Sequence, residues 1–206
     1  MYKAWLAAKI IKEANPKYLT KTNPLPSQLV KGIDEDLPEL MKYYDILEIY
    51  RPMFTDKLAK KLLANNKTIW TYGIYGTTTA PVVYRGDLWK NMRDGAESAA
   101  SYWHLEDHAG GDGLCSIDGE RSRADYGSLF VDYDYATVIS SRRFEAHRQG
   151  LEDYKLFRYC KNRVRKGSAE EKKLFDIVKR GANGSIYDMD SCRRELLDFA
   201  ASLPRR

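Results

Sequence analysis

Aromatic side chains stand at the ends of three stretches of sequence that have the pattern of β-strands. Tyr50 ends the first stretch, Tyr72 ends the second with Tyr75 shortly after it, and Trp103 ends the last. In parallel β/α folds, ligands bind at the carboxyl ends of the strands, so we expect these residues to line one site. An aromatic face stacks on the C–H face of a sugar, while neighbouring polar groups hydrogen-bond its hydroxyls. Rim packing explains any one of them equally well, but the set favours a carbohydrate ligand.

Two pairs of carboxylates are placed for acid–base chemistry. Glu106 and Asp107 follow the strand that ends at Trp103, and Asp118 and Glu120 lie further along the same irregular segment. Glycoside hydrolysis uses two carboxyl groups about 5 to 9.5 Å apart, or one carboxyl group together with a substrate amide. Adjacent carboxylates are common in loops, so Glu106 and Asp107 are weak candidates for catalysis.

The sequence indicates neither metal nor thiol chemistry. His104 and His108 would share a face only on a helix, which the glycines that follow argue against, and His147 stands apart from both. The three cysteines are far apart in the chain and form no C-x-x-C pair, as expected of separate reduced thiols. We therefore expect no metal and no cofactor.

Composition bounds the classes of partner. The 206 residues carry 34 basic and 29 acidic side chains, a formal charge of +5, with basic residues enriched between Arg158 and Arg180. A nucleic-acid-binding protein usually has a basic stripe on one face, so we expect no nucleic-acid partner. No stretch approaches the roughly 20 apolar residues of a membrane span, and the N-terminus, broken by Lys3 and Lys9, does not have the pattern of a signal peptide. We expect no membrane partner, and the compartment is unknown.

Hydrophobic periodicity predicts strands that alternate with helices. Strands are expected at residues 18–20, 45–50, 68–72 and 99–103, with a hairpin strand at 129–131. Helices are expected at residues 1–14, parts of 28–43 with an interruption at Pro38, 55–65 with a capping Thr55, 84–93, 139–164, 169–180 and 191–202, the last two around a turn at 181–184. The acidic residues 34–36 are interpreted as a solvated helix start. The irregular segment 105–126 has the length of a functional or disordered loop.

This alternation predicts an α/β fold with a parallel sheet. A complete (β/α)8 TIM barrel needs about 250 residues, and only about four parallel strands are expected here, so we predict a partial barrel, its second half, followed by C-terminal helices. The predicted domains are residues 1–165, the half-barrel, and 166–206, a helical extension.

A dense block of charged residues opens the helix expected after residue 139. Within residues 143–154 it has the pattern Arg-x-Glu-x-x-Arg-x-Gly-x-Glu-Asp-Tyr. We expect Arg143 and Glu145 to form a buried ion-pair network that fixes this helix. The functional alternative is that Arg143 points into the mouth of the site and binds the ligand.

Four segments together resemble the catalytic domain of glycoside hydrolase family 123, also described as domain of unknown function 4091. They are residues 68–73, Trp89 in the helix that follows, residues 100–103 and the block 143–154, which is the most specific part. The similarity spans roughly residues 1–156. It implies a bacterial (β/α)8 domain that hydrolyses O-glycosyl bonds of an N-acetylhexosaminide, with retention and with the help of the substrate acetamido group. Members of the family are often exported.

The family places an adjacent Asp-Glu pair at the end of its fourth strand, where Asp positions the acetamido group and Glu is the general acid. The resemblance implies that this pair precedes the helix expected at residues 1–14. We therefore expect a glycoside hydrolase-like fragment that contributes an aromatic wall and is inactive alone. Its expected partners are a carbohydrate ligand and a complementary half-barrel chain or a second copy, since exposed sheet edges favour association. The alternative is a non-catalytic carbohydrate-binding or assembly module.

The enzyme hypothesis makes a prediction about the genome. The sequence immediately upstream, in the same or another frame, should encode Asp-Glu after a hydrophobic strand. Reading that sequence is the test, and an upstream region without such a pair contradicts the hypothesis.

Overall fold

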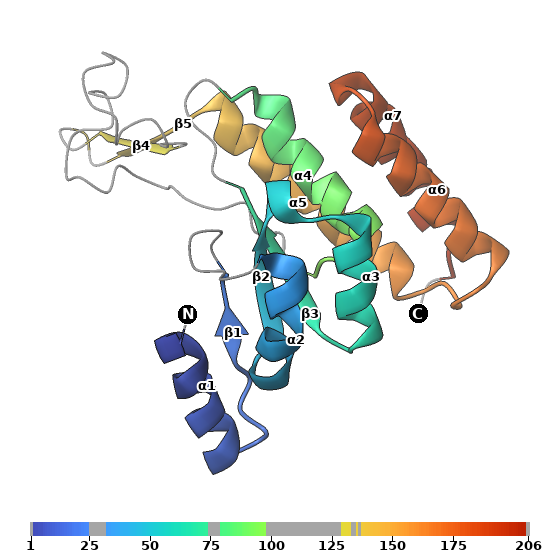
Figure 1. Cartoon of the computed structure of the whole chain (residues 1–206). Coiled ribbons are helices and arrows are strands. Elements are labelled where there is room, and N and C mark those ends of the chain that lie inside the picture. Colours follow the sequence, from blue (N-terminus) through green and yellow to red (C-terminus); the bar gives the residue numbers. More distant parts are fainter. Residues whose placement is uncertain are drawn as a thin grey trace. The chain divides into compact units, whose positions relative to one another are not determined.

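The chain has an α/β fold, in which helices alternate along the first half with the strands of a small parallel sheet. The computed structural model describes residues 2–24, 32–73, 79–97, 129–132, 135 and 137–204 (Figure 1). The predicted strand at 99–103 and the predicted loop at 105–126 lie outside these residues. The predicted α/β class is confirmed, whereas the finer prediction of a partial barrel is not tested by these elements alone.

The described residues belong to two compact units. The first comprises residues 1–73 and 94–100, and the second comprises residues 74–93 and 101–206. Helix α5 (Arg142–Lys161) falls in the second unit with α6 (Ala169–Asn183) and α7 (Ile186–Ser202), whereas the predicted domains separate it from them near residue 165.

The first unit is built on a parallel sheet of three strands in the order β1-β2-β3. They are β1 (Lys21–Thr22), β2 (Ile46–Tyr50) and β3 (Thr68–Tyr72). The prediction is confirmed for β2 and β3, but β1 begins after the predicted 18–20. The reason is that Thr20 is held by side-chain contacts, since its backbone N–H donates to Asp45 and its hydroxyl donates to the Tyr43 carbonyl.

Three helices accompany the sheet. They are α1 (Tyr2–Ala14), α2 (Ile33–Tyr43) and α3 (Asp56–Ala64), and a short 3-10 turn, η2 (Arg51–Met53), follows β2. Alternate strand residues, Leu47 and Ile49 of β2 and Ile69 of β3, are fully buried in one core with leucines of α2 and α3. This period of two is that of a strand with one face in the core. The opposite face therefore carries the remaining strand side chains.

The predicted interruption at Pro38 is wrong. Helix α2 runs unbroken through this residue, although a proline inside a helix removes one hydrogen bond. Leu37 and Leu40, on either side of the proline, are buried in the core of the first unit, and their packing offsets that loss. The acidic residues 34–36 do lie at the start of this helix, as predicted.

The chain returns to the sheet after α4 (Pro81–Asp94). Gly95 adopts a positive φ of 76°, which ends the helix, because glycine enters the left-handed region without a steric penalty. The backbone N–H of Glu97 then donates to the carbonyl of Ile69 at 2.8 Å. The segment that leads to the predicted fourth strand thus begins beside β3.

The second unit is mainly helical. Its helices α5, α6 and α7 each begin with a serine cap, in which the hydroxyl of Ser141, Ser168 or Ser185 accepts a backbone N–H three residues later. An antiparallel hairpin of β4 (Leu129–Asp132) and β5 (Thr137–Ser140) precedes α5, which confirms the hairpin strand. The predicted start of α5 at 139 is wrong, because Ile139 pairs with Phe130 in that hairpin.

The predicted turn at residues 181–184 is also wrong in part. Gly181 and Ala182 are buried within α6, and the helix ends only at Asn183. A Cβ atom at residue 181 would lie 2.3 Å from Cε3 of the fully buried Trp89. Gly181 is therefore a packing residue that lets α6 approach the indole ring of α4, and not a turn glycine.

Substituting Gly181 tests this close approach. We expect Gly181→Ala to lower the free energy of unfolding by about 1–3 kcal/mol, because the methyl group overpacks the Trp89 ring. Urea unfolding followed by circular dichroism measures the change. Gly86→Ala is the matched control, since a Cβ there meets Met189 at an ordinary 3.9 Å, and alanine gains about 1 kcal/mol in a helix. Equal losses in both variants would contradict the packing role.

Candidate functional site

The face of the sheet away from the helices gathers polar and aromatic side chains. The parallel register sets Glu48 opposite Trp70 and Tyr50 opposite Tyr72. These four side chains follow the period of two that leaves Leu47 and Ile49 on the core face. The sequence pattern therefore places them on one surface, which we call the polar sheet face.

The structure brings together two of the predicted ligand-binding residues. The rings of Tyr50 and Tyr72 lie side by side at the carboxyl ends of β2 and β3, with centroids 5.3 Å apart and planes tilted by 39°. Tyr72 is buried, and its burial raises the pKa of its hydroxyl, although a hydrogen bond with Asn23 acts in the opposite direction. Tyr50 is half-buried. The half-buried ring of Tyr50 therefore rests against the buried ring of Tyr72.

A charged pair completes the polar sheet face. Nζ of Lys21 lies 2.7 Å from Oε2 of Glu48 and 4.8 Å from the centroid of the Trp70 ring. The side chain of Glu48 is only 12% exposed, whereas that of Lys21 is 44% exposed. Sequence reasoning collected strand ends and so missed Lys21, Glu48 and Trp70. The signal that could have found Glu48 and Trp70 is the same period of two, continued back along the strands from Tyr50 and Tyr72. Lys21 lies on β1 and joins them only through the pairing of β1 with β2.

Arg51, which follows β2, has a structural partner. Its Nη2 atom lies 2.6 Å from Oδ2 of Asp94, and both side chains are less than a tenth exposed. Its guanidinium also lies over the ring of Phe54, 5.2 Å from the centroid. Arg51 therefore ties the turn η2 to the end of α4.

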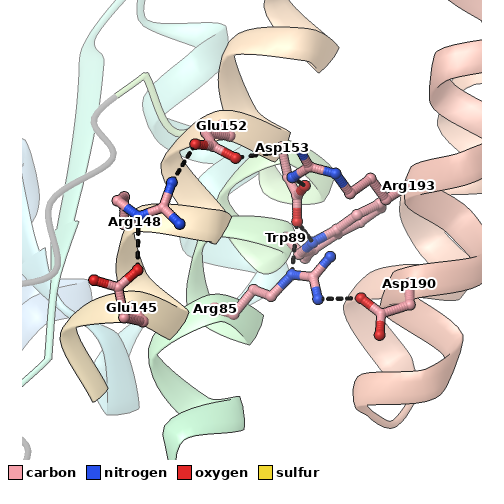
Figure 2. Close-up of polar contacts among 8 residues, drawn as sticks. All are labelled: Arg85, Trp89, Glu145, Arg148, Glu152, Asp153, Asp190 and Arg193. Carbon is pink, nitrogen blue, oxygen red and sulfur yellow. Dashed lines mark hydrogen bonds and ion pairs between the residues drawn. The ribbon is translucent and has the colours of Figure 1, made fainter. Parts of the chain in front are cut away.

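The block at residues 143–154 opens α5, as predicted, but its buried residue is a different one (Figure 2). Glu145 lies at the surface with its side chain 44% exposed, where it pairs with Arg148 and accepts a hydrogen bond from Ser140. The prediction of a buried pair at Glu145 is wrong. Arg143 lies against Tyr84, whose pKa is raised by burial and lowered in part by that arginine.

Asp153 is the buried centre of the block. Its carboxylate is fully buried, and Oδ2 accepts from Nε of Arg85 at 2.7 Å and from Nε1 of Trp89 at 2.8 Å. Oδ1 accepts from Arg193 of α7 (Figure 2). One carboxylate therefore joins α4, α5 and α7. Because a buried charge is tolerated only when it is paired and hydrogen-bonded, these three donors have to be in place together.

Further charges extend the network around Asp153. Arg85, itself buried, also binds Asp190, while Arg193 binds Glu152, which in turn binds Arg148 (Figure 2). Burial acts to lower the pKa of Arg85, but its hydrogen bonds to Asp190 and Asp153 outweigh burial and raise it. The charged groups of the network are paired with one another, so the network holds α4, α5 and α7 together. We call it the anchor.

Gly150 belongs to the same anchor. A Cβ atom at residue 150 would lie 2.8 Å from Cδ1 of Leu88 and 3.2 Å from the Cα atom of Arg85. The glycine of the block therefore allows α5 to approach α4 closely enough for Asp153 to reach the side chains of that helix. The spacing Gly-x-Glu-Asp reflects helix packing, not catalysis.

The described residues offer no metal centre, since no group of three or more His, Cys, Asp or Glu side chains lies close enough together among them. Burial raises the pKa of the Cys160 thiol to about 11 and also raises that of Cys192, which disfavours the reactive thiolate in both. Burial lowers the pKa of His147. In the part of the chain that the structure describes, no helix is long and apolar enough to span a bilayer.

Several predicted site residues fall outside the described ranges. The aromatic residues among them are Tyr75 and Trp103, and the others are His104, Glu106, Asp107, His108, Asp118 and Glu120. Their roles stay predictions.

Asp153 supplies a test of the anchor. We expect Asp153→Asn to lower the free energy of unfolding by about 3–5 kcal/mol, because it leaves the buried Arg85 and the partly exposed Arg193 with a partner that has lost its charge. Chemical denaturation followed by tryptophan fluorescence measures it. Glu145→Gln is the control, because this exposed pair should contribute little and leave the midpoint almost unchanged. A wild-type midpoint for Asp153→Asn would contradict the anchoring role.

Comparisons with known proteins do not extend the resemblance. No protein-family model matches the chain, and no curated protein matches it. The resemblance to glycoside hydrolase family 123 therefore stays a prediction from the sequence motifs.

Proposed function

We propose that the chain is a glycoside hydrolase-like domain fragment whose polar sheet face binds a carbohydrate. The observation that carries this proposal is the Tyr50–Tyr72 ring pair beside the Lys21–Glu48 ion pair and Trp70. Aromatic rings provide flat apolar surface for the C–H face of a pyranose. Charged groups beside them provide strong hydrogen bonds to its hydroxyls.

The arrangement of the first unit supports a segment of a (β/α)8 barrel. Its three parallel strands are neighbours in sequence order, and α2 and α3 pack against one face of the sheet. In such a barrel the helices cover the outside, and the opposite face of the strands lines the interior, with the active site at the carboxyl ends. The Tyr50–Tyr72 pair stands at those ends.

We propose binding without hydrolysis for the chain by itself. Hydrolysis of a glycoside needs two carboxyl roles on opposite sides of the bond, or one with an acetamido group. On the polar sheet face the carboxylate of Glu48 is already paired with Lys21 at 2.7 Å, so we assign it a hydrogen-bonding role. The family's Asp-Glu pair would supply the acid.

Replacing the half-buried ring of Tyr50 tests the binding proposal. We expect the full chain to bind β-linked N-acetylhexosamine oligosaccharides and Tyr50→Ala to weaken binding on the order of tenfold, because about 1 kcal/mol or more of stacking is lost. Isothermal titration calorimetry measures the affinity. Tyr18→Ala is the matched control, since Tyr18 is an exposed tyrosine of the same unit, before β1. Wild-type affinity in Tyr50→Ala, or equal loss in both variants, would sink the proposal.

The non-catalytic alternative is separated by a second pair of measurements. A purely binding module should bind oligosaccharide and lose binding on Trp103→Ala, with no hydrolysis even when a chain carrying the Asp-Glu pair is added. The glycoside hydrolase proposal expects release of a chromogenic aglycone once such a chain is supplied. The two hypotheses therefore differ in turnover and not in binding.

A further inference from the structure

Positive charge collects at the end of α5 and in the loop that follows it. Residues 155–169 contain no acidic residue and six basic ones, Lys155, Arg158, Lys161, Arg163, Arg165 and Lys166. We call residues 155–166 the α5 basic segment. It lies in the second unit and shares no residue with the polar sheet face of the first.

These cations are available to a ligand. All except the half-buried Arg163 are exposed, and within the described ranges none of the six forms an ion pair with a carboxylate. The acidic residues on either side are already engaged. Asp153 binds Arg85 and Arg193, Glu152 binds Arg148 and Arg193, and at the start of α6 Glu170 hydrogen-bonds with Ser168 while Glu171 accepts the backbone N–H of Gly167. The segment therefore presents positive charge that no described carboxylate neutralises.

Stabilisation of the helix end explains only part of this charge. Cations in the last turn of a helix interact favourably with its carbonyl end, which accounts for Arg158 and Lys161. Lys155 lies before that turn, and Arg165 and Lys166 lie beyond the helix. No acidic residue lies among them within residues 155–169, and the helix end does not account for their concentration.

The guanidinium of Arg163 is held against a neighbouring ring. Its guanidinium carbon lies 3.6 Å from the centroid of the Tyr159 ring, and Nη1 donates to the Tyr159 carbonyl at 3.3 Å. Its Nε is covered and has no acceptor among the described residues. A guanidinium that is stacked on a ring loses little freedom on binding, and its planar fork matches carboxylate and sulfate groups.

The surroundings of the segment favour one kind of polyanion. Phe157 and Cys160 are buried, Leu156 and Val164 are half-buried, and the partly exposed ring of Tyr159 carries the guanidinium of Arg163, so the segment offers a bilayer little free apolar surface. Single-stranded nucleic acids stack their bases on free aromatic faces, but Arg163 covers the ring of Tyr159. What remains is recognition by charge alone. We propose that the α5 basic segment binds an acidic polysaccharide through its carboxylate or sulfate groups, an assignment that rests on the proposed carbohydrate function.

Binding by the full chain tests the proposal. The probes are a heparin octasaccharide and an oligogalacturonate, which separate sulfate from carboxylate recognition, with a neutral chitooligosaccharide, a single-stranded oligonucleotide of matched charge and vesicles with an anionic lipid as comparisons. We expect an acidic glycan to bind most tightly, with affinity that falls as salt rises. The triple variant Arg158→Gln/Arg165→Gln/Lys166→Gln should weaken it on the order of tenfold. Lys17→Gln/Lys60→Gln/Lys179→Gln, an equal charge change at exposed sites elsewhere, should retain most of it.

A second variant tests the role of Arg163. Arg163→Lys keeps the charge but removes the stacked fork, so it should weaken acidic-glycan binding severalfold while the thermal midpoint stays near that of the wild type. Equal loss in the triple variant and its control overturns the proposal, as does tighter binding of the oligonucleotide or of the vesicles. If the acidic glycan binds at the segment but Tyr50→Ala does not affect the neutral sugar, the proposed function fails and the basic segment stands. If instead Tyr50→Ala weakens binding of the neutral sugar but the acidic glycan does not bind at the segment, only the proposal for the α5 basic segment fails.

Discussion

The second unit depends on the burial of one carboxylate. Asp153 is fully buried, and water cannot solvate its charge, so Arg85, Trp89 and Arg193 have to provide hydrogen bonds from two other helices. Each donor fixes the rotation of its helix. Gly150 and Gly181 allow α5 and α6 to approach the α4 side chains that surround this carboxylate. A buried ion pair of this kind adds little net stability over apolar packing, but losing one member is costly, which makes it a device for specifying one arrangement.

The first unit follows a simpler constraint. A short parallel sheet with helices packed against one face leaves the other face to polar and aromatic residues, and the parallel register sets these side by side. The Tyr50–Tyr72 pair and the Lys21–Glu48–Trp70 group are two consequences of the same alternation. That face is where we place carbohydrate binding.

Charge is distributed differently over the two kinds of surface. Around Asp153 and on the polar sheet face, cations are matched by carboxylates at hydrogen-bonding distance. Along the α5 basic segment they are not, and the acidic residues on either side are occupied by other contacts. This unneutralised charge is the reason we propose an anionic ligand for the α5 basic segment.

Local signals in the chain were enough to predict several helices and strands. The strands at Ile46–Tyr50 and Thr68–Tyr72 and the helix capped by Thr55 followed from periodicity and capping, because those signals act within a few residues. Only the tertiary structure decided the rest. Asp153 as the buried member of its block and Gly181 as a packing residue depend on partners between 40 and 100 residues away. The helix through Pro38 depends on packing against a core. A local pattern contains none of this. Lys21 reaches Glu48 only because two strands pair, so the polar sheet face could be recognised fully only after the register was known.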